Sequence, residues 1–349
     1  MNTGNFVARY LLEGTWNSFL RTDGLITPNY AFIDALQAAG FTHLVIFWGE
    51  SDDFSEPWKK LISYAHTKSI KVIKGLYLFC GSEGGWQFPS VPRHLTQWTP
   101  KKKIHIVCPN HAGAQIFWKS YYKKLCSEFE FDGFMLETAR TVDKECHCDK
   151  CRENNIYAQD RIIINRFLSE IPESEREFSF VAAAPQPGQD TLLMIDEYKA
   201  IDQRVKYFFN SRINSLEGLQ SWMNMGGRFS PLYRTGRFFL FPDGQPRKDQ
   251  VTFICRSFKT AIEAKKTAVA VEYRLNGGRH YPLSSDRKSV VIPFRPIPAS
   301  LLLIGKTAEN PCLSSSEQKV ILNEILKRTI NDLNDPLLHY FGLSNPKEA

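Results

Sequence analysis

The chain alternates regularly between short apolar segments and amphipathic segments, and this alternation constrains its fold more than any other feature. Eight apolar segments have the length and composition of strands, and the stretches between them carry apolar residues at helical spacing. The strands are expected at residues 6–13, 42–48, 71–79, 133–137, 178–184, 205–210, 229–233 and 267–273. This alternation predicts one closed parallel barrel, the (β/α)8 or TIM barrel of the α/β class.

The helices of this barrel are expected at residues 28–39, 56–68, 112–128, 156–170, 190–200, 216–225 and 249–265. An open, doubly wound sheet is the alternative, but no Gly-x-Gly-x-x-Gly turn follows the first strand, so a dinucleotide-binding fold has no support. We therefore expect a barrel with elaborated loops over residues 1–276 and a short C-terminal extension over residues 277–349 that packs on it. Within the extension, residues 300–304 form an apolar run and residues 315–333 are expected to be helical.

Charge and composition exclude several kinds of partner. The net charge is +7, but the Lys and Arg residues are scattered, so we expect no nucleic-acid partner. No apolar run reaches the roughly 18 residues of a membrane-spanning helix, so we expect no membrane partner. The first residues lack the layout of a signal peptide, which fits a cytoplasmic protein and equally a secreted or periplasmic one whose leader has been removed. The oligomeric state stays open.

Glu137 is the strongest candidate for a catalytic residue. Catalytic groups of a (β/α)8 barrel project from the carboxyl ends of its strands. Glu137 ends the expected fourth strand and follows the apolar run Phe134–Leu136. A carboxylate at an apolar strand end is partly desolvated, which raises its pKa and suits a general acid. The alternative is a structural Glu that only pairs with Arg140.

A second carboxylate is needed if the reaction is glycoside hydrolysis. The two carboxyl groups flank the scissile bond, about 5 Å apart in retaining enzymes and about 6.5–9.5 Å apart in inverting ones. Glu272 lies in the eighth strand and Glu50 follows the second. Glu272 is alternatively a buried structural ion pair, and Glu50, which has acidic neighbours, is alternatively part of a solvated loop. Weaker candidates are Glu13 and Asp23.

Aromatic and basic residues near the expected strand ends are candidates for substrate binding. Trp48, Trp86 and Tyr273 would stack on the apolar face of a sugar, although each tryptophan equally well packs under its own loop. Arg140 and Arg274 follow the fourth and eighth strands. If two arginines converge, they bind a carboxylate in a bidentate manner, and the substrate would then be an acidic sugar.

Three closely spaced cysteines, Cys146, Cys148 and Cys151, form a Cys-x-Cys-x-x-Cys segment after the fourth strand. Closely spaced thiolates commonly hold tetrahedral zinc. Cys108 is the expected fourth ligand, because the loops after the third and fourth strands are neighbours on one face of a barrel. The fallback ligands are Cys80 and His147. A four-thiolate site has no open position, so the zinc would be structural. A disulfide with a spare thiol, and three reduced cysteines, are the alternatives.

The order of these features resembles a pattern in bacterial (β/α)8 glycoside hydrolase-like proteins of polysaccharide degradation, which are related in layout to hexosaminidase and α-glucuronidase barrels. The resemblance covers Val107 to Arg152: a Cys-Pro turn, a strand that ends in a carboxylate and a Cys-x-Cys-x-x-Cys loop. It implies cleavage of a glycosidic bond with Glu137 as the acid, and a cluster that includes Cys108. Hexosaminidases place an Asp immediately before the acidic Glu. Here that residue is Leu136, so a substrate-assisted mechanism is not supported.

The sequence therefore predicts a glycoside hydrolase that acts on an oligosaccharide or a sugar terminus by paired carboxylates. Carbohydrate is the expected partner, a structural zinc ion is the expected metal, and no organic cofactor is expected. A carbohydrate-binding barrel without catalysis is the alternative. A metal-dependent hydrolase is disfavoured, since the eight histidines form no set at the strand ends.

Overall fold

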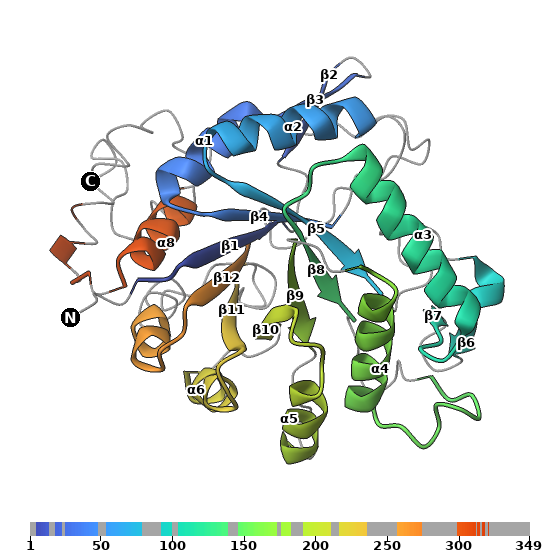
Figure 1. Ribbon diagram of the computed structural model, residues 1–349. Helices are drawn as coiled ribbons and strands as arrows, with labels where there is room; N and C mark the ends of the chain where they lie inside the picture. The colour runs from blue at the N-terminus through green and yellow to red at the C-terminus, as the bar shows by residue number, and fades with distance from the viewer. Residues whose placement is uncertain are drawn as a thin grey trace, which may run out of the picture. The chain divides into compact units, whose positions relative to one another are not determined.

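The main sheet of the protein closes on itself in a computed structural model (Figure 1). The strand order is β1-β12-β11-β10-β9-β8-β5-β4, and the pairings of β1, β11 and β12 and of β5, β8, β9 and β10 are parallel. The barrel strands are β1 (Ala8–Glu13), β4 (His43–Ile46), β5 (Lys71–Tyr77), β8 (Gly133–Glu137), β9 (Glu177–Ala182), β10 (Val205–Asn210), β11 (Phe229–Thr235) and β12 (Ala268–Tyr273). The predicted (β/α)8 barrel is thus confirmed, with each strand at its expected place.

The structure describes residues 5–13, 18–22, 25–47, 54–78, 92–99, 104–138, 146–172, 176–182, 191–210, 216–235, 257–273, 299–311, 313–314, 316–317 and 320. Its helices are α1 (Tyr30–Ala39), α2 (Ser55–Thr67), α3 (Ala112–Glu128), α4 (Ile156–Ser169), α5 (Thr191–Lys199), α6 (Leu216–Asn224) and α8 (Ala299–Glu309). Residues 257–263 are also helical. Within the described part of the chain, no helix has the length and apolar composition needed to cross a membrane.

Two antiparallel hairpins lie in segments that were expected to be loops. The first pairs β2 (Phe19–Thr22) with β3 (Leu25–Pro28), and the second pairs β6 (Thr96–Thr99) with β7 (Ile104–Val107). The short helix η2 (Arg93–Leu95) directly precedes β6. The first hairpin also changes the start of α1. Pro28 belongs to β3, and Asn29 caps the helix by accepting the N–H of Phe32 at 3.2 Å, so α1 begins at Tyr30 and not at Pro28.

The fold divides into two compact units, and each contains part of the barrel. In the unit with β1, β11 and β12, helix α8 lies beside α1 (Figure 1). The approach is close, because a Cβ atom on Gly305 would lie 2.3 Å from the carbonyl oxygen of Ala39. The apolar run predicted at residues 300–304 is therefore part of a helix that packs against α1 and β1. The domain boundary between residues 276 and 277 stays a prediction.

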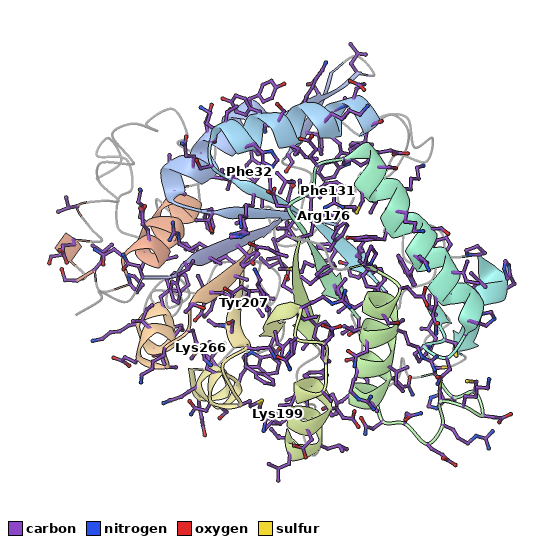
Figure 2. All side chains as sticks on the ribbon, in the orientation of Figure 1. Phe32, Phe131, Arg176, Lys199, Tyr207 and Lys266 are labelled. Atoms are coloured by element: carbon purple, nitrogen blue, oxygen red, sulfur yellow. The ribbon has the colours of Figure 1, made fainter. Side chains whose placement is uncertain are left out.

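The other unit contains β5, β8, β9 and β10 with α3, α4 and α5 around them (Figure 1). Side chains fill the layer between these strands and helices (Figure 2), and aromatic rings from both sides contact one another in it. Phe134 of β8 packs against Tyr122 of α3 with ring centroids 4.9 Å apart, and Phe180 of β9 packs against Tyr198 of α5 at 5.5 Å. These contacts identify which residues of each strand face the helices, and so which residues face the inside of the barrel.

Candidate functional site

Glu137 lies on the inner face of the barrel at the carboxyl end of β8. Phe134 points to the helix layer, and successive side chains of a strand alternate between its two faces. Leu136 therefore points outward and is fully buried, whereas Met135 and Glu137 point inward. Glu137 is half-buried. The predicted position is the one that barrel enzymes use for chemistry.

The inner face around Glu137 is apolar and aromatic. Glu137 pairs in register with Tyr77 of β5 and Val181 of β9, so the three residues are neighbours on one face. Two residues earlier along the same strands, Gly75 pairs with Met135. A Cβ atom on Gly75 would lie 2.3 Å from the ring of Phe47. The Phe47 and Tyr77 ring centroids are 4.8 Å apart. Aromatic side chains thus line the inner face next to the strand end that carries Glu137.

Glu272 also faces the inside of the barrel. Tyr233 of β11 packs against Phe258 in the helical segment 257–263, with ring centroids 5.1 Å apart, so Tyr233 points outward. Val271 pairs in register with Tyr233 and points the same way, which turns Glu272 inward. Glu272 is 6% exposed and lies one residue before the end of β12. Its role as second carboxylate stays a prediction.

Glu13 is turned the other way, and its carboxylate is hydrogen-bonded to Ser18. It pairs in register with Tyr273, one position beyond Glu272, so it lies on the outer face of its strand. Its carboxylate accepts the N–H of Ser18 at 2.8 Å and also the Ser18 hydroxyl. Glu13 is 4% exposed. These contacts make it an anchor for the segment that leads into β2.

Several predicted site residues lie outside the described residues: Trp48, Glu50, Trp86, Arg140 and Arg274, as well as Asp23 and Cys80. Tyr273 is the last residue of the β12 backbone. The substrate-binding roles of these residues stay predictions.

Four cysteines come together: Cys108, Cys146, Cys148 and Cys151 have their sulfur atoms within 4.8 Å of one another. The Cys108 Sγ atom lies 3.6 Å from the Cys148 Sγ atom and 3.7 Å from the Cys151 Sγ atom. A tetrahedral site with metal–sulfur bonds of about 2.3 Å has sulfur–sulfur edges of about 3.8 Å. The four thiols are free of disulfides. The donor set and its spacing therefore fit a tetrahedral metal, and Cys108 is the fourth member as predicted, whereas the fallback His147 is exposed.

Local structure presents these thiols from two segments. Cys108 precedes α3, and its carbonyl accepts the N–H of His111, whose Nδ1 atom caps the helix by accepting the N–H of Gly113 at 3.1 Å. Cys148 and Cys151 form a turn in which the Cys151 N–H donates to the Cys148 carbonyl at 2.8 Å. Asn155 then caps α4. The Cys-x-x-Cys spacing thus closes one turn directly before a helix.

The thiols differ in their readiness to ionise. The hydrogen bond from the Cys146 thiol lowers the pKa of Cys108 to about 5, which makes Cys108 the thiolate of the cluster. The same contact raises the pKa of Cys146, and burial raises the pKa of Cys151 to about 11. Two buried thiols therefore keep their protons at neutral pH. A cation that takes all four sulfurs as ligands has to displace these protons.

Sequence reasoning missed the polar residues that surround the cluster. Asn110 donates from its Nδ2 atom to the Cys151 sulfur at 3.2 Å and to the Lys150 carbonyl at 3.2 Å. Arg166 of α4 donates to the Pro109 carbonyl at 2.9 Å. Gln159, also in α4, is buried and bonds to the backbone of the cysteine segment. An isolated Asn, Arg or Gln carries no local sequence signal for such a contact.

The fold is shared with known glycoside hydrolases. A β-N-acetylhexosaminidase from Bacteroides fragilis has a TM-score of 0.59 and 12% identity, over 93% of this chain and 70% of that one. A glycoside hydrolase family 20 β-N-acetylglucosaminidase has a TM-score of 0.54 and 10% identity, over 98% and 76%. An α-amylase from Geobacillus thermoleovorans has a TM-score of 0.50 and 13% identity, over 86% and 78%. No protein-family model and no curated protein sequence matches the chain. At these identities the likeness concerns the fold: this chain has the TIM-barrel architecture found in these glycoside hydrolases.

Proposed function

We propose that the protein is a glycoside hydrolase in which Glu137 is the general acid. The observation that carries the proposal is the position of Glu137, half-buried on the inner face of the barrel at the carboxyl end of its fourth strand, next in register to Tyr77. The glycoside hydrolases that share this fold support the same reaction class. The substrate would be an oligosaccharide or a sugar terminus.

In the proposed reaction, Glu137 protonates the glycosidic oxygen as its bond to the anomeric carbon breaks. The acid has to carry its proton before this transfer, and partial burial of Glu137 after the apolar run Phe134–Leu136 favours its neutral form. Leu136 stands where hexosaminidases have an Asp, and it points to the helix layer. We therefore assign the second role to a carboxylate of the protein, Glu272 or Glu50, as nucleophile or as the base that deprotonates water.

The substrate-binding part of the proposal concerns the strand-end loops. Trp48, Trp86 and Tyr273 are proposed to stack on sugar rings. Arg140 and Arg274 are proposed to bind a carboxylate if the sugar is acidic.

We further propose that the four-cysteine cluster binds a structural zinc ion. The donor set, four thiols with sulfur atoms within 4.8 Å of one another, supports zinc because thiolates are the ligands of closed structural zinc sites. Such an ion would tie the segment before α3 to the segment before α4. With all four positions taken by sulfur, the ion would have no position for substrate, so its contribution would be to loop structure.

The test is hydrolysis of a broad glycoside and oligosaccharide panel by the wild type and by Glu137→Gln. Glu128→Gln, an exposed residue at the end of α3, is the matched control. We expect the wild type and Glu128→Gln to cleave the same glycan and Glu137→Gln to lose most of that rate while it stays folded. Equal rates for all three would refute the assignment of Glu137. Binding of a glycan without cleavage by any of them would favour a carbohydrate-binding barrel without catalysis.

A further inference from the structure

Gln159 is a buried amide whose side chain bonds to the peptide of the first cysteine in the segment. It lies in the first turn of α4 and is 1% exposed. Its Oε1 atom accepts the N–H of Cys146 at 2.9 Å, and its Nε2 atom donates to the Cys146 carbonyl at 3.0 Å. The two bonds reproduce the reciprocal pairing that a neighbouring strand would make with this residue.

The same amide also reaches the far end of the segment. Its Nε2 atom donates to the Asn154 carbonyl at 3.0 Å and, at a longer 3.3 Å, to the Cys151 carbonyl. Cys151 is in turn bonded to Cys148 through the backbone of their shared turn. One side chain therefore ties Cys146 to the turn that presents the other two thiols.

The hydrogen bonds of Gln159 satisfy backbone groups of the cysteine segment that are not paired within a helix or a strand. Cys146 and Cys151 are both fully buried, and buried peptide groups need hydrogen-bond partners. Residues 146–147 belong to neither a helix nor a strand. A carboxamide of this length carries an acceptor and two donors in one group, whereas a carboxylate has acceptors alone and a thioether has almost neither. The residue type therefore matches the groups that it has to satisfy.

We propose that Gln159 is the positioning residue of the cysteine cluster: its amide assembles the thiols before a metal arrives. This inference rests on the proposed zinc centre and adds how that centre is built. If the segment is ordered in the metal-free protein, the entropy of ordering it does not weaken metal binding. Residues that hold metal ligands in place typically change metal affinity by about 10- to 100-fold when they are replaced.

Asn165 offers a matched control on the same helix. Its Nδ2 atom donates to the Ala200 carbonyl at 2.9 Å, and its Oδ1 atom accepts the N–H of Asp202 at 2.8 Å. This is the same kind of reciprocal bonding from α4 to an irregular backbone segment, but residues 200–202 contain no cysteine. Replacing Asn165 by Leu therefore costs similar hydrogen bonds without touching the cluster.

The experiment titrates Co²⁺, whose absorption spectrum reports tetrahedral thiolate coordination, into metal-free protein and then displaces it with Zn²⁺. Gln159→Met is expected to bind both ions about 10- to 100-fold more weakly than the wild type, with the four-thiolate spectrum retained at saturation. Asn165→Leu is expected to keep the wild-type affinity, even where both variants melt at lower temperature. Equal affinity of Gln159→Met and the wild type would overturn the role of Gln159. A wild type that binds neither ion would instead overturn the zinc centre, and the inference with it.

A second measurement uses the wild type alone, so it tests the proposal even if Gln159→Met does not fold. Hydrogen exchange of the metal-free wild type is expected to show a protected Cys146 amide, because Gln159 accepts its N–H without help from a metal. Exchange at the rate of an unfolded chain would overturn the assembly of the cluster before metal binding. A protected amide supports it, and loss of that protection in folded Gln159→Met would assign the protection to this side chain.

Discussion

Glu137 and the cysteine cluster lie close together in the sequence, yet they are held in place by different physical means. Glu137 belongs to β8, so its direction follows from strand alternation and from register with β5 and β9. Cys146 lies in irregular backbone and depends on side-chain hydrogen bonds from α4. A strand-end residue takes its geometry from the whole barrel, whereas the cluster takes its geometry from a few polar contacts. A substitution that disturbs one of the two sites should therefore leave the other site intact.

The largest expected effect is a loss of catalytic rate, without a loss of structure, when Glu137 is replaced. Glu137→Gln is expected to lower kcat by about 10²–10⁴-fold on substrates with poor leaving groups, because a general acid contributes about that much. The loss should shrink on aryl glycosides whose leaving groups need little protonation. Steady-state kinetics with both substrate types checks this, and Co²⁺ affinity should not change. A loss that is equal on both substrate types would speak against the acid role.

The next effect concerns the pH dependence of the metal cluster. Metal binding displaces the protons of Cys146 and Cys151, whose pKa values are raised, that of Cys151 to about 11. Affinity, and any stability that the metal adds, should therefore rise with pH and be lost as the pH falls. Each displaced proton contributes roughly tenfold per pH unit, so these two protons alone give roughly 100-fold per pH unit between about pH 6 and 9. Co²⁺ titrations at several pH values measure this slope, and a flat profile would contradict the assigned protonation states.

A smaller effect tests whether packing alone shapes the inner face near Glu137. Gly75→Ala places a methyl group 2.3 Å from the present position of the Phe47 ring, so a shift is required. We expect a loss of about 1–3 kcal/mol in the free energy of unfolding, as for other overpacked sites. Urea denaturation measures it. The double variant Gly75→Ala, Phe47→Leu should recover part of the loss, and no recovery would mean that Phe47 is not the obstacle.

The smallest effect concerns the side-chain amide of Asn110, which donates to the Cys151 sulfur and to the Lys150 carbonyl. Asn110→Ala removes the donor to Cys151 and is expected to weaken Co²⁺ binding by about 0.5–1.5 kcal/mol, or up to roughly tenfold. Asn224→Ala, an exposed residue at the end of α6, serves as the control in the same titration. A loss as large as that expected for Gln159→Met would show that the cluster depends on its outer contacts equally, and not chiefly on Gln159.

Most of the barrel was predictable because its signals are local. Apolar runs and helical periodicity placed the eight strands, and α3 has the predicted bounds, Ala112 to Glu128. The hairpin of β2 and β3 was missed, although Asp23-Gly24 between its strands is a favoured hairpin dipeptide. The hairpin of β6 and β7 was missed because its strands have four residues each, too few for a clear alternation. Helix α8 was seen only as an apolar run, since its face is defined by contact with α1.

By itself, the sequence determined the barrel, the strand-end position of Glu137 and the three-cysteine segment, because strand length, periodicity and ligand spacing are properties of neighbouring residues. Only the tertiary structure decided that Glu272 turns inward while Glu13 turns outward to Ser18, because pairing register and packing show which face of a strand is inside. It likewise showed that Cys108 belongs to the cluster and that Gln159 accepts the N–H of Cys146. Those contacts connect elements that are separate in the chain, and a sequence pattern read along the chain does not contain the distances between them.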